Sequence, residues 1–86
     1  MRAVIVWKDN TDYARSIIDW KREFDVRTGK EIEDVDPDTR EGASFAKLYD
    51  VLKYPTILAL SDDGREMQRW DGEFLPKIDD VSFYAR

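Results

Sequence analysis

The sequence predicts a single α/β domain over residues 1–86, in which helices cover both faces of a four-stranded mixed sheet with strand order 2-1-3-4. Two continuous apolar runs, residues 3–7 and 56–60, are typical of strands that are buried on both faces. Apolar residues at helical spacing lie between these runs. An Asp-Asp-Gly turn at residues 62–64 predicts a hairpin after the second run. The resulting element order is β-α-β-α-β-β-α.

The first strand and first helix follow from composition and spacing. Residues 3–7 are rich in β-branched side chains and predict a central strand. Asn10 or Thr11 can cap the next helix, which we expect over residues 12–26. Its apolar positions repeat at spacings of four, three and four, and they are Tyr13, Ile17, Trp20 and Phe24. Gly29 suits the end of this helix because glycine adopts positive φ without strain.

The middle of the chain predicts an edge strand and a second helix. Residues 30–36 are mostly charged, which is typical of an edge strand protected from pairing with other sheets. A turn at residues 36–39 precedes a helix over residues 40–50. This helix has to end before Pro55, because the residue before a proline is pushed out of helical conformation. The second apolar strand, residues 56–60, follows directly.

The last third predicts the other edge of the sheet and a short helix. Residues 65–70 return from the hairpin as an amphipathic strand, which Asp71 and Gly72 end. Pro76 suits the first turn of a final helix. Leu75, Ile78 and Val81 then provide its apolar side.

Composition and charge exclude several classes of function. The chain has no Cys and no His, so no disulfide, thiol nucleophile, zinc finger or His general base can form. Its net charge of −5 argues against a nucleic-acid partner and an anionic membrane partner, since phosphate binding needs a basic patch. No apolar run reaches the length of a membrane span. The first strand begins close to Met1, so we expect no signal peptide and a cytoplasmic protein.

Three segments carry a resemblance to a known superfamily. Residues 46–56 read A-x-x-Y-x-V-x-x-Y-P-T, similar to the thioredoxin-family segment that leads from the second helix into the cis-proline strand. The turn at residues 62–64 and Gly72 resemble the family's hairpin turn and the glycine before its last helix. The chain thus resembles the thioredoxin-like superfamily in its short glutaredoxin arrangement. This resemblance implies a three-layer fold and a cis Tyr54-Pro55 bond.

The redox motif of that family is missing. Glutaredoxins carry Cys-Pro-Tyr-Cys after the first strand, where this chain has Thr11, Asp12, Tyr13 and Ala14. Thr11 replaces the attacking cysteine and Ala14 the resolving one, and a hydroxyl group has no thiolate-like state near neutral pH. Thiol-disulfide exchange and iron-sulfur binding are therefore excluded. We expect no cofactor and no metal, and an enzyme of non-thiol chemistry ranks last among the possible functions.

Once redox chemistry is excluded, the resemblance implies a binding module. In the family, the backbone groups of the residue before the cis-proline pair with an extended peptide or with glutathione. The sequence therefore predicts a redox-inactive domain whose groove beside Pro55 binds a protein or peptide. The residues expected around the groove are Lys8, Thr11, Tyr13, Tyr54, Pro55, Trp70, Asp71 and Gly72.

Other interpretations of the same residues stay open. Thr11 can be a plain helix cap, the Tyr54-Pro55 step can be a simple bend, and the aromatic side chains can pack locally. Trp70 is the aromatic residue least expected to be buried, because it ends an edge strand. The alternative function is structural: a self-association or assembly module that uses an exposed edge strand or helix face.

Overall fold

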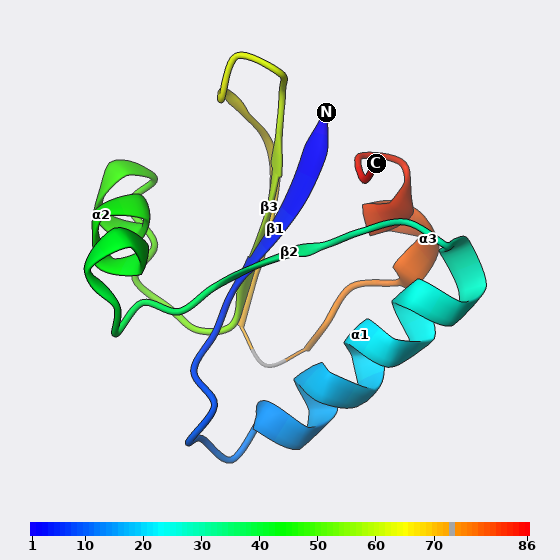
Figure 1. Ribbon diagram of the computed structural model, residues 1–86, viewed down its shortest axis with the longest axis horizontal. Coiled ribbons are helices and arrows are strands. Elements are labelled where there is room, and N and C mark those ends of the chain that lie inside the picture. Colours follow the sequence, from blue (N-terminus) through cyan, green and yellow to red (C-terminus); the bar gives the residue numbers. More distant parts are fainter. Residues whose placement is uncertain (73) are drawn as a thin grey trace.

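The computed structural model describes residues 1–72 and 74–86 and contains the seven elements in the expected order (Figure 1). They are β1 (Arg2–Val6), α1 (Ala14–Thr28), β2 (Glu33–Val35), α2 (Arg40–Leu48), β3 (Thr56–Leu60), β4 (Glu66–Asp71) and α3 (Ile78–Ser82). The strands form one sheet in the order β2-β1-β3-β4. β1 pairs parallel with β2 and antiparallel with β3, and β3 pairs antiparallel with β4. The predicted mixed sheet and its strand order are confirmed.

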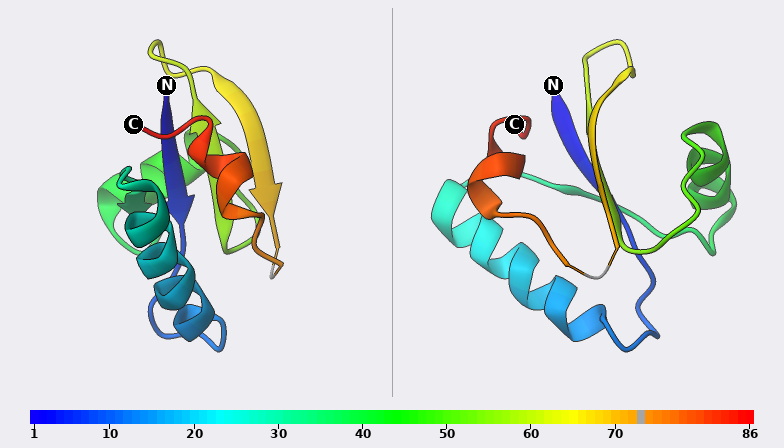
Figure 2. Two further views of the ribbon diagram at one scale, coloured as in Figure 1. Left: turned by 90° about the vertical axis from the view of Figure 1, so that its right-hand side faces the viewer. Right: turned by 180° about the vertical axis from the view of Figure 1, so that it is seen from behind.

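The sheet divides the core into two apolar clusters. On one face, Ala3, Ile5 and Ile57 pack with buried residues of α1 and α3, which are Ile17, Phe24, Ile78 and Val81. On the other face, alternate residues of the same strands pack against α2 and the segment after it, and they are Val4, Val6, Leu58, Leu60, Ala46 and Val51. Figure 2 shows α1 and α3 together on one side of the sheet and α2 on the other. The three predicted layers are confirmed.

The start of α1 differs from the prediction. The helix begins at Ala14, and the capping position belongs to Tyr13, whose side chain makes no capping hydrogen bond. The Thr11 hydroxyl donates to the carbonyl of Lys8 (2.8 Å) instead of capping the helix, and the N–H of Ala14 donates to the carbonyl of Thr11 (3.2 Å). The chain thus makes a turn before the helix. At the other end, Gly29 has φ 64° as predicted.

The two edge strands also differ from the prediction. β2 contains three residues rather than seven, because the C-terminal segment holds the residues before it. The N–H of Glu31 donates to the carbonyl of Arg86 (3.1 Å), and Lys30 Nζ donates to the carbonyl of Ser82 (2.8 Å). β4 continues to Asp71, one residue further than expected, because Asp71 pairs with Thr56 of β3.

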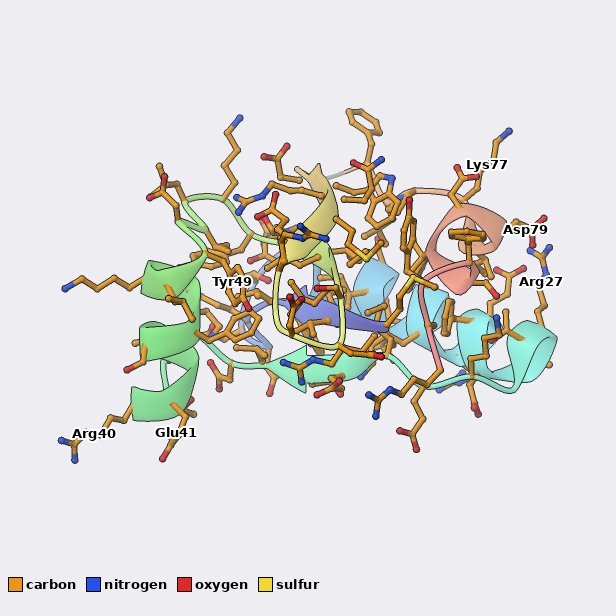
Figure 3. The ribbon with its side chains drawn as sticks, turned by 90° about the horizontal axis from the view of Figure 1, so that it is seen from above. Arg27, Arg40, Glu41, Tyr49, Lys77 and Asp79 are labelled. Carbon is orange, nitrogen blue, oxygen red and sulfur yellow. The ribbon has the colours of Figure 1, made fainter. Side chains whose placement is uncertain are left out.

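Arg69 connects β4 to the end of α2. Its guanidinium donates to both carboxylate oxygens of Glu66 (2.7 and 3.1 Å), to the carbonyl of Asp50 (3.2 Å) and to the carbonyl of Tyr49. Hydrogen bonding to Glu66 raises the pKa of Arg69. Tyr49 itself reaches from α2 toward the β3–β4 hairpin, where its hydroxyl donates to the carbonyl of Gly64 (Figure 3). Two polar side chains therefore join α2 to the hairpin.

The first turn of α2 packs tightly against the turn that precedes it. Thr39 caps the helix, since its hydroxyl oxygen accepts from the N–H of Gly42 (3.0 Å) and its O–H donates to the carbonyl of Asp36 (2.8 Å). A Cβ added to Gly42 would lie 1.7 Å from the Asp36 carbonyl oxygen, a backbone atom. Glycine is required here for close approach rather than for an unusual φ.

This contact predicts that Gly42→Ala destabilises the protein. Overpacking costs about 1–3 kcal/mol, which outweighs the roughly 1 kcal/mol by which alanine favours a helix over glycine. Urea denaturation of wild type and variant measures the difference in the free energy of unfolding. Ser44→Ala is the matched control, because Ser44 is exposed in the same helix and should gain a few tenths of a kcal/mol. If Gly42→Ala is as stable as wild type, the close approach of Gly42 to the Asp36 carbonyl is wrong.

Candidate functional site

The predicted site residues come from segments that leave one end of the sheet. Val6 ends β1 and pairs with Thr56, the first residue of β3, which in turn pairs with Asp71 at the end of β4. The loop after β1 and the segment before β3 therefore lie beside the end of β4, and Figure 1 shows them together at the end of the sheet opposite the hairpin. The topology thus brings together parts of the chain that are far apart in sequence.

Pro55 and Gly72 meet at the centre of this end. The Tyr54-Pro55 peptide bond is cis, and Pro55 is buried. The N–H of Gly72 donates to the carbonyl of Pro55 (3.1 Å), which extends the β3–β4 pairing by one step. The Thr56 hydroxyl donates to the carbonyl of Lys53 (2.7 Å). Hydrogen bonds on both sides of Pro55 therefore hold the corner in place.

Lys8 and Thr11 join the corner from the loop after β1. The Lys8 ammonium lies 5.2 Å from the centre of the Tyr54 ring, a cation–π contact, and 3.4 Å from a carboxylate oxygen of Asp38. Thr11 holds the same loop through its hydrogen bond to the carbonyl of Lys8. Asp38 lies in the turn predicted at residues 36–39, and its pairing with Lys8 has no signal in the sequence.

The aromatic side chains do not pack on one face. Tyr54 packs against the cluster beneath α2, whereas Tyr13 and Trp70 pack against the cluster beneath α1 and α3. Trp70 pairs with Ile57 across the strands, so its side chain lies on the Ile57 face. Its ring contacts Tyr84 edge-on, with centroids 5.9 Å apart. Tyr54 thus belongs to one side of the sheet end, and Trp70 to the other.

Two exposed apolar side chains near the corner were not predicted. Leu52, two residues before Tyr54, is 82% exposed, and Phe74, two residues after Gly72, is 93% exposed. Neither lies in a helix or strand, so no periodic pattern points to it. Folded monomers do expose single apolar side chains, and these two lie within two residues of Tyr54 and Gly72 in the sequence.

Two hollows in the surface lie away from this corner. One of about 280 Å³ lies between β2 and α2, and a shallow one of about 420 Å³ lies beside α3. Neither is lined by Tyr54 or Pro55. Among residues 1–72 and 74–86, no group of three His, Cys, Asp or Glu side chains could hold a metal ion. No helix in those residues is long and apolar enough to cross a membrane.

This chain resembles known proteins in its fold. No protein-family model matches it, and no curated protein matches it in sequence. Among solved structures, thioredoxin 1 from the thermophilic eubacterium Thermosipho africanus TCF52B superimposes with a TM-score of 0.69 at 19% identity, covering 98% of this chain and 89% of that one. A structure described as a malarial protein gives 0.63 at 18% identity and covers 84% and 80%.

The turn before α1 predicts that a disulfide can be built there. The hydrogen bond from Ala14 N–H to the Thr11 carbonyl makes these residues the first and fourth of a turn, whose Cα atoms lie within about 7 Å, close to the disulfide range. We expect the double variant Thr11→Cys, Ala14→Cys to form an intramolecular disulfide on mild oxidation, detected by mass spectrometry after alkylation. The pair Thr11→Cys, Ser16→Cys is the control and should stay reduced. A double variant at positions 11 and 14 that fails to oxidise contradicts the turn geometry.

The strand order, the helix layers and the superposition all indicate the same fold. The order β2-β1-β3-β4, with α1 and α3 on one face and α2 on the other, matches a thioredoxin over nearly the whole of this chain. An identity of 19% shows the fold alone. The chain has a thioredoxin-like fold and contains no cysteine with which to carry the redox chemistry of that fold.

Proposed function

We propose that this domain is a redox-inactive binding module and that it binds a protein or peptide at the corner formed by Lys8, Leu52, Tyr54 and Phe74, here called the Tyr54 surface. One observation carries the proposal. In the part of the chain that the structure describes, no backbone–backbone hydrogen bond engages the N–H or C=O of Tyr54. Backbone groups next to a sheet end that have no backbone partner among the described residues suit pairing with an extended segment of another chain.

The side chains around Tyr54 support the same function. Leu52 and Phe74 offer apolar area that gains free energy when water is removed from it, at roughly 25 cal/mol per Å². The Tyr54 ring adds an aromatic surface, which is enriched at protein interfaces. Lys8 and Asp38 form a polar rim beside it. An apolar centre with a polar rim is the usual anatomy of an interface between proteins.

The remaining predicted residues have supporting roles in this proposal. Thr11 holds the loop that carries Lys8, while Pro55, Asp71 and Gly72 join β3 to β4 beneath the surface. Tyr13 and Trp70 pack on the other face of the sheet, so we leave them out of this binding surface. The net charge of −5 favours a protein partner over nucleic acid.

Substitution of surface residues tests this proposal. Tyr54→Ala and Phe74→Ala should each reduce capture of a partner by the immobilised domain at least fivefold, since interface centres carry most of the binding energy. Val26→Ala is the matched control, because Val26 is 78% exposed on α1, away from the corner. Circular dichroism establishes that each variant is folded. Capture that is equal for wild type and both variants rules out the Tyr54 surface as the site.

A second candidate function is assembly through self-association. The observation that favours it is the pair Leu48 and Leu52, two largely exposed leucines at and just beyond the end of α2. An apolar pair of this kind can be covered by a second copy of the same surface. Leu52 belongs to both proposed surfaces, so a second copy and another partner could not cover it at the same time.

Sedimentation velocity separates the two functions. If the leucines mediate assembly, the sedimentation coefficient should rise with protein concentration, and Leu48→Ser should shift the transition to at least fivefold higher concentration. Val26→Ser serves as the control for an exposed apolar residue elsewhere. A wild-type protein that stays monomeric at high concentration eliminates the assembly function and leaves partner binding untouched.

A further inference from the structure

A second surface lies beside α3, on the side of the sheet opposite to the cluster that contains Tyr54. It is an open hollow of about 420 Å³, lined by Gln68, Trp70, Asp79, Asp80, Phe83 and Tyr84. Two of these residues come from β4 and the others from α3 and the residues just after it. The hollow therefore lies at the junction of the β4 edge and the last helix.

Three aromatic rings at this hollow are turned steeply against one another. The rings of Trp70 and Tyr84 have centroids 5.9 Å apart and an angle of 62° between their planes. The rings of Phe83 and Tyr84 are 4.9 Å apart at 85°. Rings at such angles present their faces in different directions, so a ligand in the hollow can meet more than one π surface.

Core packing does not explain all three rings. Trp70 packs against the apolar cluster beneath α1 and α3, and that contact accounts for its position. Phe83, by contrast, is 68% exposed. It contacts Tyr84 without being buried, so most of its apolar surface contributes nothing to folding. An aromatic ring left this exposed at the edge of a hollow suits contact with a ligand.

The charge at the hollow is negative. Its lining includes Asp79 and Asp80 and no Lys or Arg. One carboxylate oxygen of Asp79 lies 3.6 Å from a guanidinium nitrogen of Arg27, and Figure 3 shows these two side chains next to each other at the ends of α3 and α1. Within residues 1–72 and 74–86, no salt bridge engages Asp80. Asp80 therefore has a carboxylate to offer to a cation.

We propose that this hollow binds an arginine side chain presented by a protein partner. The negative faces of aromatic rings and a carboxylate both attract a cation, and both repel an anion. Arginine fits better than lysine because its flat guanidinium stacks on aromatic rings, is more weakly hydrated and can bind a carboxylate through two N–H groups. This proposal does not rest on the Tyr54 surface.

The experiment follows the indole N–H signals of the isotope-labelled protein by NMR while the peptide acetyl-Gly-Arg-Gly-amide is added. The chain has three tryptophans, and two of them provide internal references. Trp7 donates to a carboxylate oxygen of Asp34 (2.9 Å) and Trp20 to the carbonyl of Pro76 (3.0 Å), so their indole groups are engaged within the fold. Only the signal of Trp70 should shift and saturate. The same peptide with citrulline, which is neutral and of equal shape, should cause no saturable shift.

Variants locate the binding. Phe83→Ala and Asp80→Asn, both at exposed positions, should each weaken binding of the arginine peptide about three- to fivefold, as the loss of one cation–π contact or one ion pair predicts. Val26→Ala and Asp25→Asn are the matched controls on exposed positions of α1 and should bind as wild type does. Three results would overturn the proposal: no saturable shift at Trp70, equal binding of the citrulline peptide, or tighter binding of a lysine peptide. Unchanged affinity in both Phe83→Ala and Asp80→Asn would also overturn it.

Discussion

The antiparallel pairing of β1 with β3 is the constraint on which the rest of this structure depends. Val4 faces Leu58 and Ile5 faces Ile57 across the pair, and all four side chains are fully buried. A pair of strands that is apolar on both faces is stable only if both faces are covered, because each buried side chain of this size contributes about 1.5–3 kcal/mol. The three-layer arrangement follows: α1 and α3 cover the Ile5 face, and α2 covers the Val4 face.

The fold could be predicted from sequence because its signals are local and repeated. The apolar runs and the helical spacing of Ile17 and Phe24 depend only on the residues concerned. Element ends were harder to predict. β2 starts late because Lys30 and Glu31 are held by the C-terminal segment, and no short window of sequence contains those partners. α1 starts late because the Thr11 hydroxyl bonds the nearby carbonyl of Lys8, a local turn that competes with helix capping by the same side chain.

The candidate site could be predicted in part, for the same reason. The order of the strands, which the sequence predicts, brings the loop that contains Lys8 to the corner at Tyr54. The face of the sheet on which Trp70 lies depends on its pairing with Ile57, and a shift of one residue would reverse it. Phe74 follows the last strand without any periodic pattern, so its exposure could be learned only from the fold.

A thioredoxin-like fold without thiols shows how far architecture and chemistry can be separated. The arrangement of strands and helices matches that of a thioredoxin at 19% identity, although this chain contains no cysteine. Functions of such a domain have to come from the side chains at its surface rather than from the fold. Tyr54 and Trp70, which belong to the two proposed surfaces, pack on opposite sides of one sheet, so partners at these two surfaces would not compete for space.

The guanidinium of Arg69 has a consequence for any such partner. It bonds the carbonyls at the end of α2, the helix that leads to Tyr54, and it does so from β4, the strand that leads to Gly72. Both chain segments that approach the corner are thereby held before a ligand arrives. Ordering of flexible loops is a large entropic cost of association, often several kcal/mol, and a pre-organised corner avoids much of it. We therefore expect affinity at the proposed Tyr54 surface to depend on Arg69, a side chain outside that surface.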